Sequence, residues 1–391
     1  MNYSFVSPRQ IQFGWGLRRQ AGEFARTLGT HAWIVLGSRT LAKSEAYREL
    51  LTSLEEQGLT HELLTTISRE PEVEDVDRVV SQLRDVQNTS DKIFLLAVGG
   101  GAAIDLAKAA AAIATNRQGK SVRDFLEGVG KGLRIETAPL PLMVIPTTSG
   151  TGSEATKNAV ISSYDPPFKK SLRSEMMVPG IVLIDPELTV TVSPETTAYS
   201  GMDAITQCIE SYISRQTKPI PQALALQGLQ LALPSLEEAV FNPQSREARE
   251  RMSHAALLSG MALANSGLGM AHGVAAALGV HCRVPHGLAC AVMLPTALQV
   301  NREVAGQQLC ELANACGFGT GEESAERETD QFIENVESIG RHIGIPEKLS
   351  ELGVERAQLP QIVAGSRGNS MSGNPRELSD SELLKILEGM L

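Results

Sequence analysis

The sequence has few cysteines, few aromatic residues and an excess of acidic over basic side chains. Five cysteines occur in 391 residues and no two form a CxxC pair, which excludes a disulfide framework and a cysteine-paired zinc module. We expect reduced thiols in the protein core, at Cys208, Cys282, Cys290, Cys310 and Cys316. The net charge of −10 argues against a nucleic-acid partner or an anionic membrane surface. Aromatic residues at 4% argue weakly against a large aromatic substrate.

Long hydrophobic runs are also missing. No stretch approaches eighteen uninterrupted apolar residues, so we expect no transmembrane helix. The first ten residues, MNYSFVSPRQ, contain neither a basic segment nor an apolar run, so no signal peptide is predicted. These features predict a cytoplasmic protein, and a hydrophobic content of 42% is ordinary for a globular one.

The first half of the chain alternates short apolar runs with helical patterns. The runs lie at 32–37, 92–101, 141–156 and 180–185, and the helical patterns include 41–58 and the alanine-rich stretch after 101. Continuous apolar strands separated by helices are typical of a parallel sheet covered on both faces. From 198 to 313 the chain reads as successive helices, interrupted by prolines at 219, 221, 234 and 243, and Ser379 with Glu382 predicts a capping box for a last short helix. We predict an α/β domain over 1–193 and an all-helical domain over 194–391.

Two glycine-containing loops follow predicted strands. In VGGGAAIDLAKAAA, Gly99, Gly100 and Gly101 would let the backbone approach a ligand, and the amides of the next helix would face a bound anion. The segment matches neither GxGxxG nor a Walker A loop, and a tight structural turn is the alternative. In PTTSGTGSEAT, the hydroxyls of Thr147, Thr148 and Thr151 follow another strand, at the sheet edge where α/β proteins bind ligands. The alternative is a solvated loop with capping hydroxyls.

Candidate metal ligands lie in the second half. Asp203 and Gln207 are four residues apart and project from one helix face. His272, His281 and His286 fall within fifteen residues. Two imidazoles, the Asp203 carboxylate and a fourth ligand would hold a divalent metal. The alternatives are histidines satisfied within the core and a merely polar helix face.

At this point the sequence resembles the iron-containing (group III) alcohol dehydrogenases. The resemblance is carried, in order, by GGGAAIDLAKAAA, PTTSGTGSEAT, IDPELT, GMDAITQCIESY, HGVAAALGVHCRVPHGLACAVMLP and NPREL. It covers nearly the whole chain. It implies a dehydroquinate synthase-like architecture, with a dinucleotide-binding α/β domain, an all-α domain and an active site in the cleft between them. It also implies a divalent iron or zinc, a small alcohol or aldehyde substrate and a homodimer.

Matched residue by residue, the resemblance assigns the metal to Asp203, Gln207, His272 and His286. The residues it assigns to NAD or NADP share the two loops and their surroundings. They are Ser38, Arg39, Gly99, Gly100, Gly101, Asp105, Thr147, Thr148, Thr151, Asn158 and Lys169, with Lys170 as a neighbouring alternative to the last.

Three positions depart from the family pattern. Gln207 replaces a histidine ligand, and a neutral amide oxygen is a poorer ligand for Fe²⁺ or Zn²⁺. Ala276 replaces a histidine linked to proton relay, and His281 is the candidate substitute. Ser38 replaces an aspartate that binds the adenosine ribose; together with Arg39 it permits a 2′-phosphate and hence NADP.

The predicted function is an NAD(P)-dependent alcohol dehydrogenase or aldehyde reductase in which a metal acts as Lewis acid. Catalytic roles fall to His272, His286, Gln207 and His281. One alternative is a metal-independent reductase of the maleylacetate reductase type. Another is a dehydroquinate synthase-like lyase, which needs a basic cluster where the segment 198–300 offers little beyond Arg283. The non-enzymatic alternative is a nucleotide-binding domain that has lost its chemistry.

Overall fold

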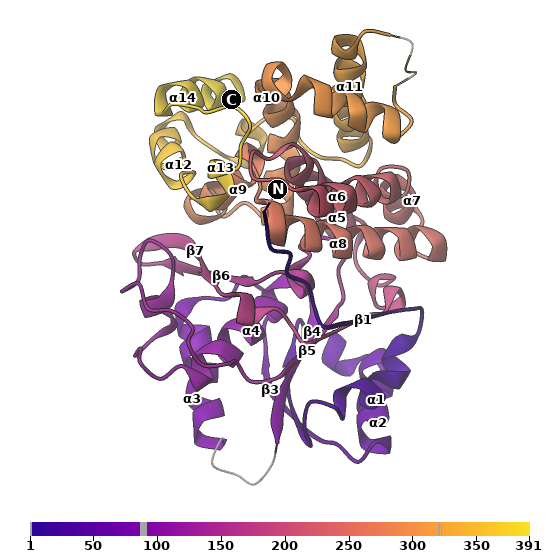
Figure 1. The fold of residues 1–391 in the computed structure, drawn as a ribbon, viewed down its shortest axis with the longest axis vertical. Coiled ribbons are helices and arrows are strands. Elements are labelled where there is room, and N and C mark those ends of the chain that lie inside the picture. Colours follow the sequence, from indigo (N-terminus) through magenta and orange to yellow (C-terminus); the bar gives the residue numbers. More distant parts are fainter. Residues whose placement is uncertain (1, 87–91, 320, 322) are drawn as a thin grey trace. The chain divides into compact units, whose positions relative to one another are not determined.

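The structure is a computed structural model and describes residues 2–86, 92–319, 321 and 323–391. The chain folds into two compact units. One contains residues 6–148 and 152–191 around a parallel sheet. The other is helical and contains residues 192–391, the segment 149–151 and a short N-terminal stretch through Phe5. The two units are described separately below (Figure 1).

A six-stranded sheet forms the centre of the first unit within the described residues. Its strand order is β1-β8-β5-β4-β2-β3, and every neighbouring pair is parallel. The strands are β1 (Gln10–Phe13), β2 (His31–Leu36), β3 (Thr60–Thr66), β4 (Ile93–Gly99), β5 (Leu142–Pro146) and β8 (Ile181–Ile184). The parallel sheet predicted from the four apolar runs is confirmed, and β1 and β3 are additional edge strands.

Helices cover both faces of this sheet, with α1 and α2 on one side and α3 and α4 on the other (Figure 1). They are α1 (Ala21–Ala25), α2 (Glu45–Glu56), α3 (Val73–Val86) and α4 (Gly101–Thr115). Alternate residues of β4 point to opposite faces, so Phe94, Leu96 and Val98 join the core beneath α1 and α2. The helix α4 is buried along most of its length, which explains why its sequence is rich in alanine.

A small hairpin is attached to the first unit. It consists of β6 (Asn158–Tyr164) and β7 (Pro167–Arg173), which pair antiparallel. The 3₁₀ helices of this unit are η1 (Leu17–Gln20), η2 (Leu41–Lys43), η3 (Val122–Phe125), η4 (Ser153–Ala155), η5 (Glu175–Met177) and η6 (Pro186–Thr189).

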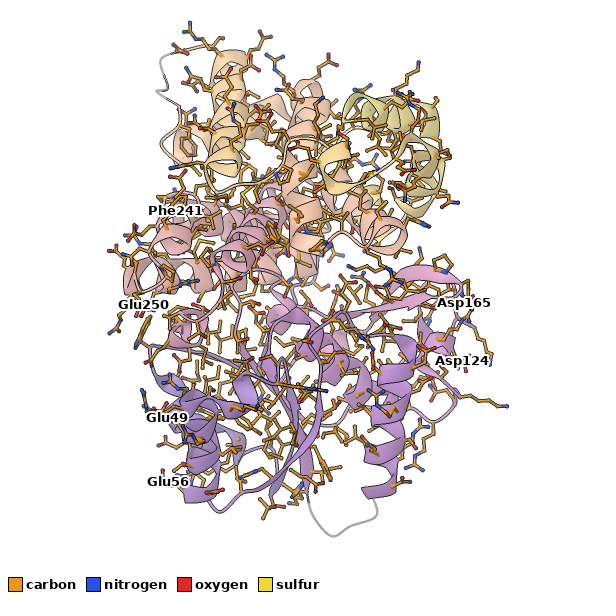
Figure 2. The ribbon with its side chains drawn as sticks, turned by 180° about the vertical axis from the view of Figure 1, so that it is seen from behind. Glu49, Glu56, Asp124, Asp165, Phe241 and Glu250 are labelled. Atoms are coloured by element: carbon orange, nitrogen blue, oxygen red, sulfur yellow. The ribbon has the colours of Figure 1, made fainter. Side chains whose placement is uncertain are left out.

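A buried charge cluster joins η1 to the IDPELT motif. Asp185 is fully buried, and it accepts hydrogen bonds from Gly16 N at 2.8 Å and from the guanidinium of Arg18 at 2.8 Å. Arg18 also contacts Glu187 at 2.6 Å and Glu49 at 2.7 Å. Figure 2 labels Glu49 on α2. The motif therefore has a structural role in tying the first helical turn to the end of β8.

The second unit is helical, as the sequence predicted after residue 198. Its helices are α5 (Pro194–Ile213), α6 (Pro219–Ala232), α7 (Leu236–Phe241), α8 (Arg246–Ser266), α9 (Met270–Cys282), α10 (His286–Ala315), α11 (Ala325–His342), α12 (Leu359–Gly365), α13 (Asn369–Ser372) and α14 (Asp380–Gly389), with η7 (Ser350–Leu352) and η8 (Arg356–Gln358). Pro219 and Pro221 occupy the first turn of α6, where proline costs no hydrogen bond, and the Ser379–Glu382 capping box of α14 is present.

The helix α5 is the centre of this unit. It begins at Pro194, with the Ser193 hydroxyl accepting from Thr196 N at 3.2 Å, and from Gly201 to Ile213 every residue is buried. It packs against α6, α8 and α10. Polar residues on such a helix must be satisfied inside the protein, so they identify the places where chemistry is built into the core.

Within the described residues, none of the helices is by itself long and apolar enough to cross a membrane. The pair α8 and α9 meets the length and composition requirement when joined, but the chain bends by 100° between them.

Candidate metal and nucleotide sites

Four potential metal ligands converge inside the helical unit. Asp203 comes from α5, His272 from the first turn of α9, and His286 and Cys290 from the first two turns of α10. One donor atom from each lies within 4.8 Å of all the others. The structure thus brings together Asp203, His272 and His286, as predicted from the sequence, and adds a thiol that the sequence analysis assigned to the inert core.

Asp203 and His272 form the buried part of this group. Asp203 is 1% exposed and His272 is 4% exposed. The Asp203 Oδ1 atom lies 3.2 Å from His272 Nε2 and 3.9 Å from His286 Nε2. One carboxylate oxygen thus faces the ring nitrogens of both histidines.

Glu210 fixes the orientation of the His272 ring through Nδ1, the nitrogen that does not face Asp203. It lies on α5, two turns beyond Asp203, and its Oε2 atom is 2.7 Å from His272 Nδ1. The same carboxylate accepts from Gly269 N at 2.9 Å and Ala271 N at 2.7 Å, at the start of α9. Because Nδ1 donates to Glu210, the Nε2 lone pair of neutral His272 is directed at the group. A carboxylate that holds the far nitrogen of a histidine is the usual support of a metal ligand.

Sequence reasoning missed Glu210, although a signal was present. Residues three, four and seven apart lie on one face of a helix, so Asp203, Gln207 and Glu210 form a polar stripe on one face of α5.

The electrostatics of the group favour a cation. Burial alone would lower the pKa of His272, but Cys290, Asp203 and Glu210 outweigh it and raise that pKa well above the usual value. Burial would raise the pKa of Asp203, but the His272 hydrogen bond and the His286 charge lower it below the usual value. A site that holds a positive charge on a buried imidazole stabilises a divalent cation for the same reason. The residues present therefore fit the metal that the fold family implies.

Gln207 has other partners. It is 3% exposed; its side-chain nitrogen donates to Thr151 O at 3.3 Å and its oxygen accepts from the Ser259 hydroxyl at 2.7 Å. Because Thr151 O can only accept, the amide nitrogen must face it, and the oxygen then faces Ser259.

His281 is not in the metal-ligand group. It lies nine residues beyond His272 on α9, about 13 Å further along the helix axis, with its ring beside Gly365. Ala276 is one turn after His272 on the same helix and offers no titratable group. The proposed relay through His281 stays a prediction.

The glycine loop lies at the end of β4. A Cβ atom on Gly99 would come within 2.7 Å of the Gly37 Cα, so two strand ends meet there backbone to backbone. Gly100 begins α4 and has no side-chain cap among the described residues. A Cβ atom on Gly100 would lie 3.1 Å from the Thr148 hydroxyl, so the threonine loop lies beside the same helix start. The amides at the start of a fifteen-residue helix fit the pyrophosphate of a nicotinamide dinucleotide.

The predicted cofactor residues outside the glycine loop include two segments, one after β2 and one after β5. Ser38 and Arg39 follow β2; the Ser38 hydroxyl accepts from Leu41 N at 3.0 Å, and Arg39 is exposed. Thr147 follows β5, with its N–H on Gly99 O at 3.0 Å, whereas Thr151 belongs to the segment grouped with the helical unit.

Asn158 and Lys169 belong to the β6–β7 hairpin, and Asp105 of α4 contacts it. Asp105 accepts from the Ser153 hydroxyl and from Val160 N at 2.9 Å, so its carboxylate positions the segment that follows the threonine loop. Lys169 pairs with Glu70 at 2.5 Å. The Asn158 Oδ1 atom is buried without a hydrogen-bond partner among the described residues, and is thus free to accept from a ligand.

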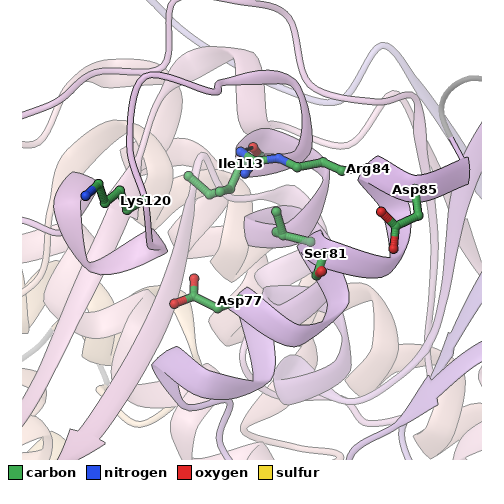
Figure 3. A pocket seen from close by; sticks show the side chains of 7 residues that line it. Asp77, Ser81, Arg84, Asp85, Ile113 and Lys120 are labelled. Carbon is green, nitrogen blue, oxygen red and sulfur yellow. Dashed lines mark hydrogen bonds between the residues drawn. The ribbon is translucent and has the colours of Figure 1, made fainter.

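A surface hollow elsewhere on this unit has a structural explanation. It lies between α3 and α4 and is lined by Asp77, Val80, Ser81, Arg84, Asp85, Ile113 and Lys120 (Figure 3). The guanidinium of Arg84 donates to Ile113 O at 2.7 Å, near the C-terminus of α4. Asp77 accepts from Val122 N at 2.8 Å. The polar groups are thus used for helix capping and loop anchoring.

Known proteins resemble the chain along its whole length. Residues 8–186 match the family model for iron-containing alcohol dehydrogenase, and residues 197–391 match the C-terminal model of the Fe-containing alcohol dehydrogenase family. Long-chain-alcohol dehydrogenase 1 of Geobacillus thermodenitrificans is 30% identical over 98% of this chain and 95% of its own. NADPH-dependent butanol dehydrogenase of Clostridium saccharobutylicum is 29% identical over 98% and 97%. A crystal structure of 1,3-propanediol oxidoreductase superposes with a TM-score of 0.93, at 27% identity and with both chains fully covered.

Two family models that together span most of the chain, and a relative at 30% identity over nearly its full length, settle the family. The resemblance inferred from the motifs is confirmed, as are the fold class and the enzyme class. This chain belongs to the iron-containing alcohol dehydrogenase family, the NAD(P)-dependent oxidoreductases that interconvert alcohols and carbonyl compounds.

Proposed function

We propose that this chain interconverts a small primary alcohol and its aldehyde with NAD or NADP, using one divalent cation held by Asp203, His272 and His286. The observation that carries the proposal is the convergence of a buried carboxylate and two imidazoles, one of them oriented by Glu210. The relatives named for butanol, long-chain alcohols and 1,3-propanediol support primary alcohols as the substrate class. We further propose a homodimer, which the resemblance to the family implies, located in the cytoplasm.

The cation would supply Lewis acidity toward the substrate oxygen, and the nicotinamide would give or accept the hydride. The protein's own residues perform the positioning. Asp203 contributes a negative charge in a buried setting, where its electrostatic effect is little screened. Glu210 holds the His272 proton on Nδ1 and thereby fixes the ring orientation.

The sheet unit would bind the nucleotide. The phosphates would lie at the start of α4, whose N-cap residue Gly100 has no side-chain cap, and Asn158 offers a buried acceptor. Ser38 places no negative charge after β2, and the exposed Arg39 can pair with a 2′-phosphate, so we propose that NADPH is accepted as well as NADH.

A metal-independent reductase is the second candidate, because the Gln207 oxygen accepts from Ser259. In that case Asp203, His272 and His286 would contact the substrate directly.

The test is oxidation of NADH and NADPH with propanal, butanal and longer aldehydes, before and after exhaustive chelation, with Zn²⁺ or Fe²⁺ then restored. Loss of activity on chelation and recovery with the metal supports the first candidate. Full activity without metal supports the second. No turnover of any aldehyde with either nucleotide contradicts both.

A further inference from the structure

Cys290 differs from the other cysteines in its surroundings. It is fully buried, one helical turn after His286, and its Sγ atom lies 3.7 Å from His286 Nε2. Cys208 is equally buried and, like Cys290, lies in the apolar core of the helical unit, but among the described residues it belongs to no group of potential metal ligands. Of the five cysteines, all in the described part of the chain, Cys290 is the one grouped with a carboxylate and two imidazoles.

Three of the six donor separations are close to the edges of a tetrahedral metal centre, and all six lie within 4.8 Å. Bond lengths of about 2.0 Å to nitrogen and oxygen and about 2.3 Å to sulfur give tetrahedral edges of about 3.3 Å between nitrogen and oxygen and about 3.6 Å between sulfur and nitrogen. The corresponding distances are 3.2 Å from Asp203 to His272, 3.9 Å from Asp203 to His286 and 3.7 Å from Cys290 to His286. The thiol thus stands where a fourth protein ligand belongs, and a substrate oxygen would bind the metal as a fifth ligand.

Residue 207 is the position from which the family pattern takes the remaining ligand, but here the Gln207 side chain is used for hydrogen bonds within the protein. The oxygen that Gln207 would offer a metal accepts the Ser259 hydroxyl at 2.7 Å, and its nitrogen holds Thr151 O. Ser259 is fully buried, and its hydroxyl also lies 2.8 Å from Ala256 O, so its one proton is shared between the Gln207 oxygen and this carbonyl. The metal ligand that Gln207 of α5 does not supply can therefore come from Cys290 of α10.

We propose that Cys290 is the fourth protein ligand of the metal, as a thiolate, and that Gln207 has become a structural hydrogen-bonding residue. The inference rests on the proposed metal function of this site. On binding, the thiol proton leaves to solvent as the sulfur–metal bond forms. Asp203 and the thiolate then balance the two charges of the cation, and sulfur in the donor set favours zinc over harder divalent ions.

The test uses Co²⁺ as the probe on metal-free, full-length protein. A thiolate bound to Co²⁺ gives an intense near-ultraviolet charge-transfer band that nitrogen and oxygen ligands do not give. We expect one Co²⁺ per chain and this band in the wild type. The band should persist in Gln207→Ala and in the matched control Cys208→Ser, and disappear in Cys290→Ser. Zinc affinity, measured by competition with a chromogenic chelator, should fall more than about 100-fold in Cys290→Ser, since even supporting residues of metal sites cost 10–100-fold.

The wild-type spectrum decides the matter even if a variant fails to fold. Stoichiometric Co²⁺ binding without the band would overturn the proposal, as would a band that survives in Cys290→Ser. Aldehyde reduction is measured separately. A thiolate band in a protein that reduces no aldehyde would contradict the proposed function. Aldehyde reduction without the band would contradict only the assignment of Cys290 as a ligand.

Discussion

Changing Glu210 to glutamine removes one charge and one acceptor while keeping the shape of the side chain. Three donors converge on this carboxylate: His272 Nδ1 at 2.7 Å, Ala271 N at 2.7 Å and Gly269 N at 2.9 Å. A glutamine oxygen in place of Oε2 keeps two of them, but its NH₂ group then faces the buried Ala271 N–H. That loss costs about 1.5–3 kcal/mol, and weakening the two other bonds from charged to neutral adds about 2 kcal/mol. The expected destabilisation is therefore about 3–5 kcal/mol.

Two assays separate the parts of this prediction. Because the chain has two units, a single unfolding free energy is a poor measure, and hydrogen exchange of peptides from α9 reports the local effect. We expect faster exchange at the start of α9 in metal-free Glu210→Gln and zinc affinity weakened by about 10–100-fold. Glu311→Gln is the matched control, because Glu311 accepts only from side chains, from Tyr212 of the same helix α5 at 2.9 Å and from Gln307 at 3.4 Å. Unchanged exchange together with zinc affinity within threefold of the wild type would refute the role assigned to Glu210.

Three further predictions concern the sheet unit. Ser38→Asp should lower kcat/KM for NADPH relative to NADH by about fivefold or more, because a carboxylate near a 2′-phosphate costs at least about 1 kcal/mol; an unchanged ratio would contradict the placement of the adenosine ribose beside Ser38. Gly99→Ala should abolish nucleotide binding, measured by fluorescence titration with NADPH, because its Cβ atom would lie 2.7 Å from the Gly37 Cα; binding within twofold of the wild type would refute the close approach. Arg18→Leu should destabilise the region of η1 and β8 by about 3–5 kcal/mol, measured by hydrogen exchange of peptides from these segments, because Asp185 stays buried without its cation; a loss under about 1 kcal/mol would show that the backbone donors suffice.

Much of the fold could be predicted because buried strands leave a simple signal. The runs that became β2, β4, β5 and β8 are continuous in apolar residues, since helices cover both faces of the sheet. The strand β3 lies at the sheet edge and is half exposed, so its sequence THELLTT carries no such run. The hairpin β6–β7 is held partly by contacts with distant residues, such as Ser162 N on Pro71 O at 2.9 Å, which no local pattern encodes.

The site was predictable to a different extent. Asp203, His272 and His286 could be named because the family motifs identify them, and the structure brings all three together. Glu210 and Cys290 were missed although they lie at helical spacings from Asp203 and His286. Their roles depend on the packing of α9 and α10 near α5, which is tertiary structure and is not encoded in the spacing of residues along one helix. For Gln207 the reverse holds. The sequence named the residue but could not reveal its hydrogen-bond partners, because Thr151 and Ser259 come from distant segments.

The central claim is that Asp203, His272 and His286 hold a divalent cation needed for activity. Elemental analysis of protein purified without a metal-affinity tag tests it most directly, with His272→Ala compared against His281→Ala, a histidine of the same helix that lies outside the ligand group. The account predicts one equivalent of zinc or iron per chain in the wild type and in His281→Ala, and loss of both metal and aldehyde reduction in His272→Ala. A full equivalent of metal in His272→Ala, or a wild-type enzyme that is active without metal, would contradict it.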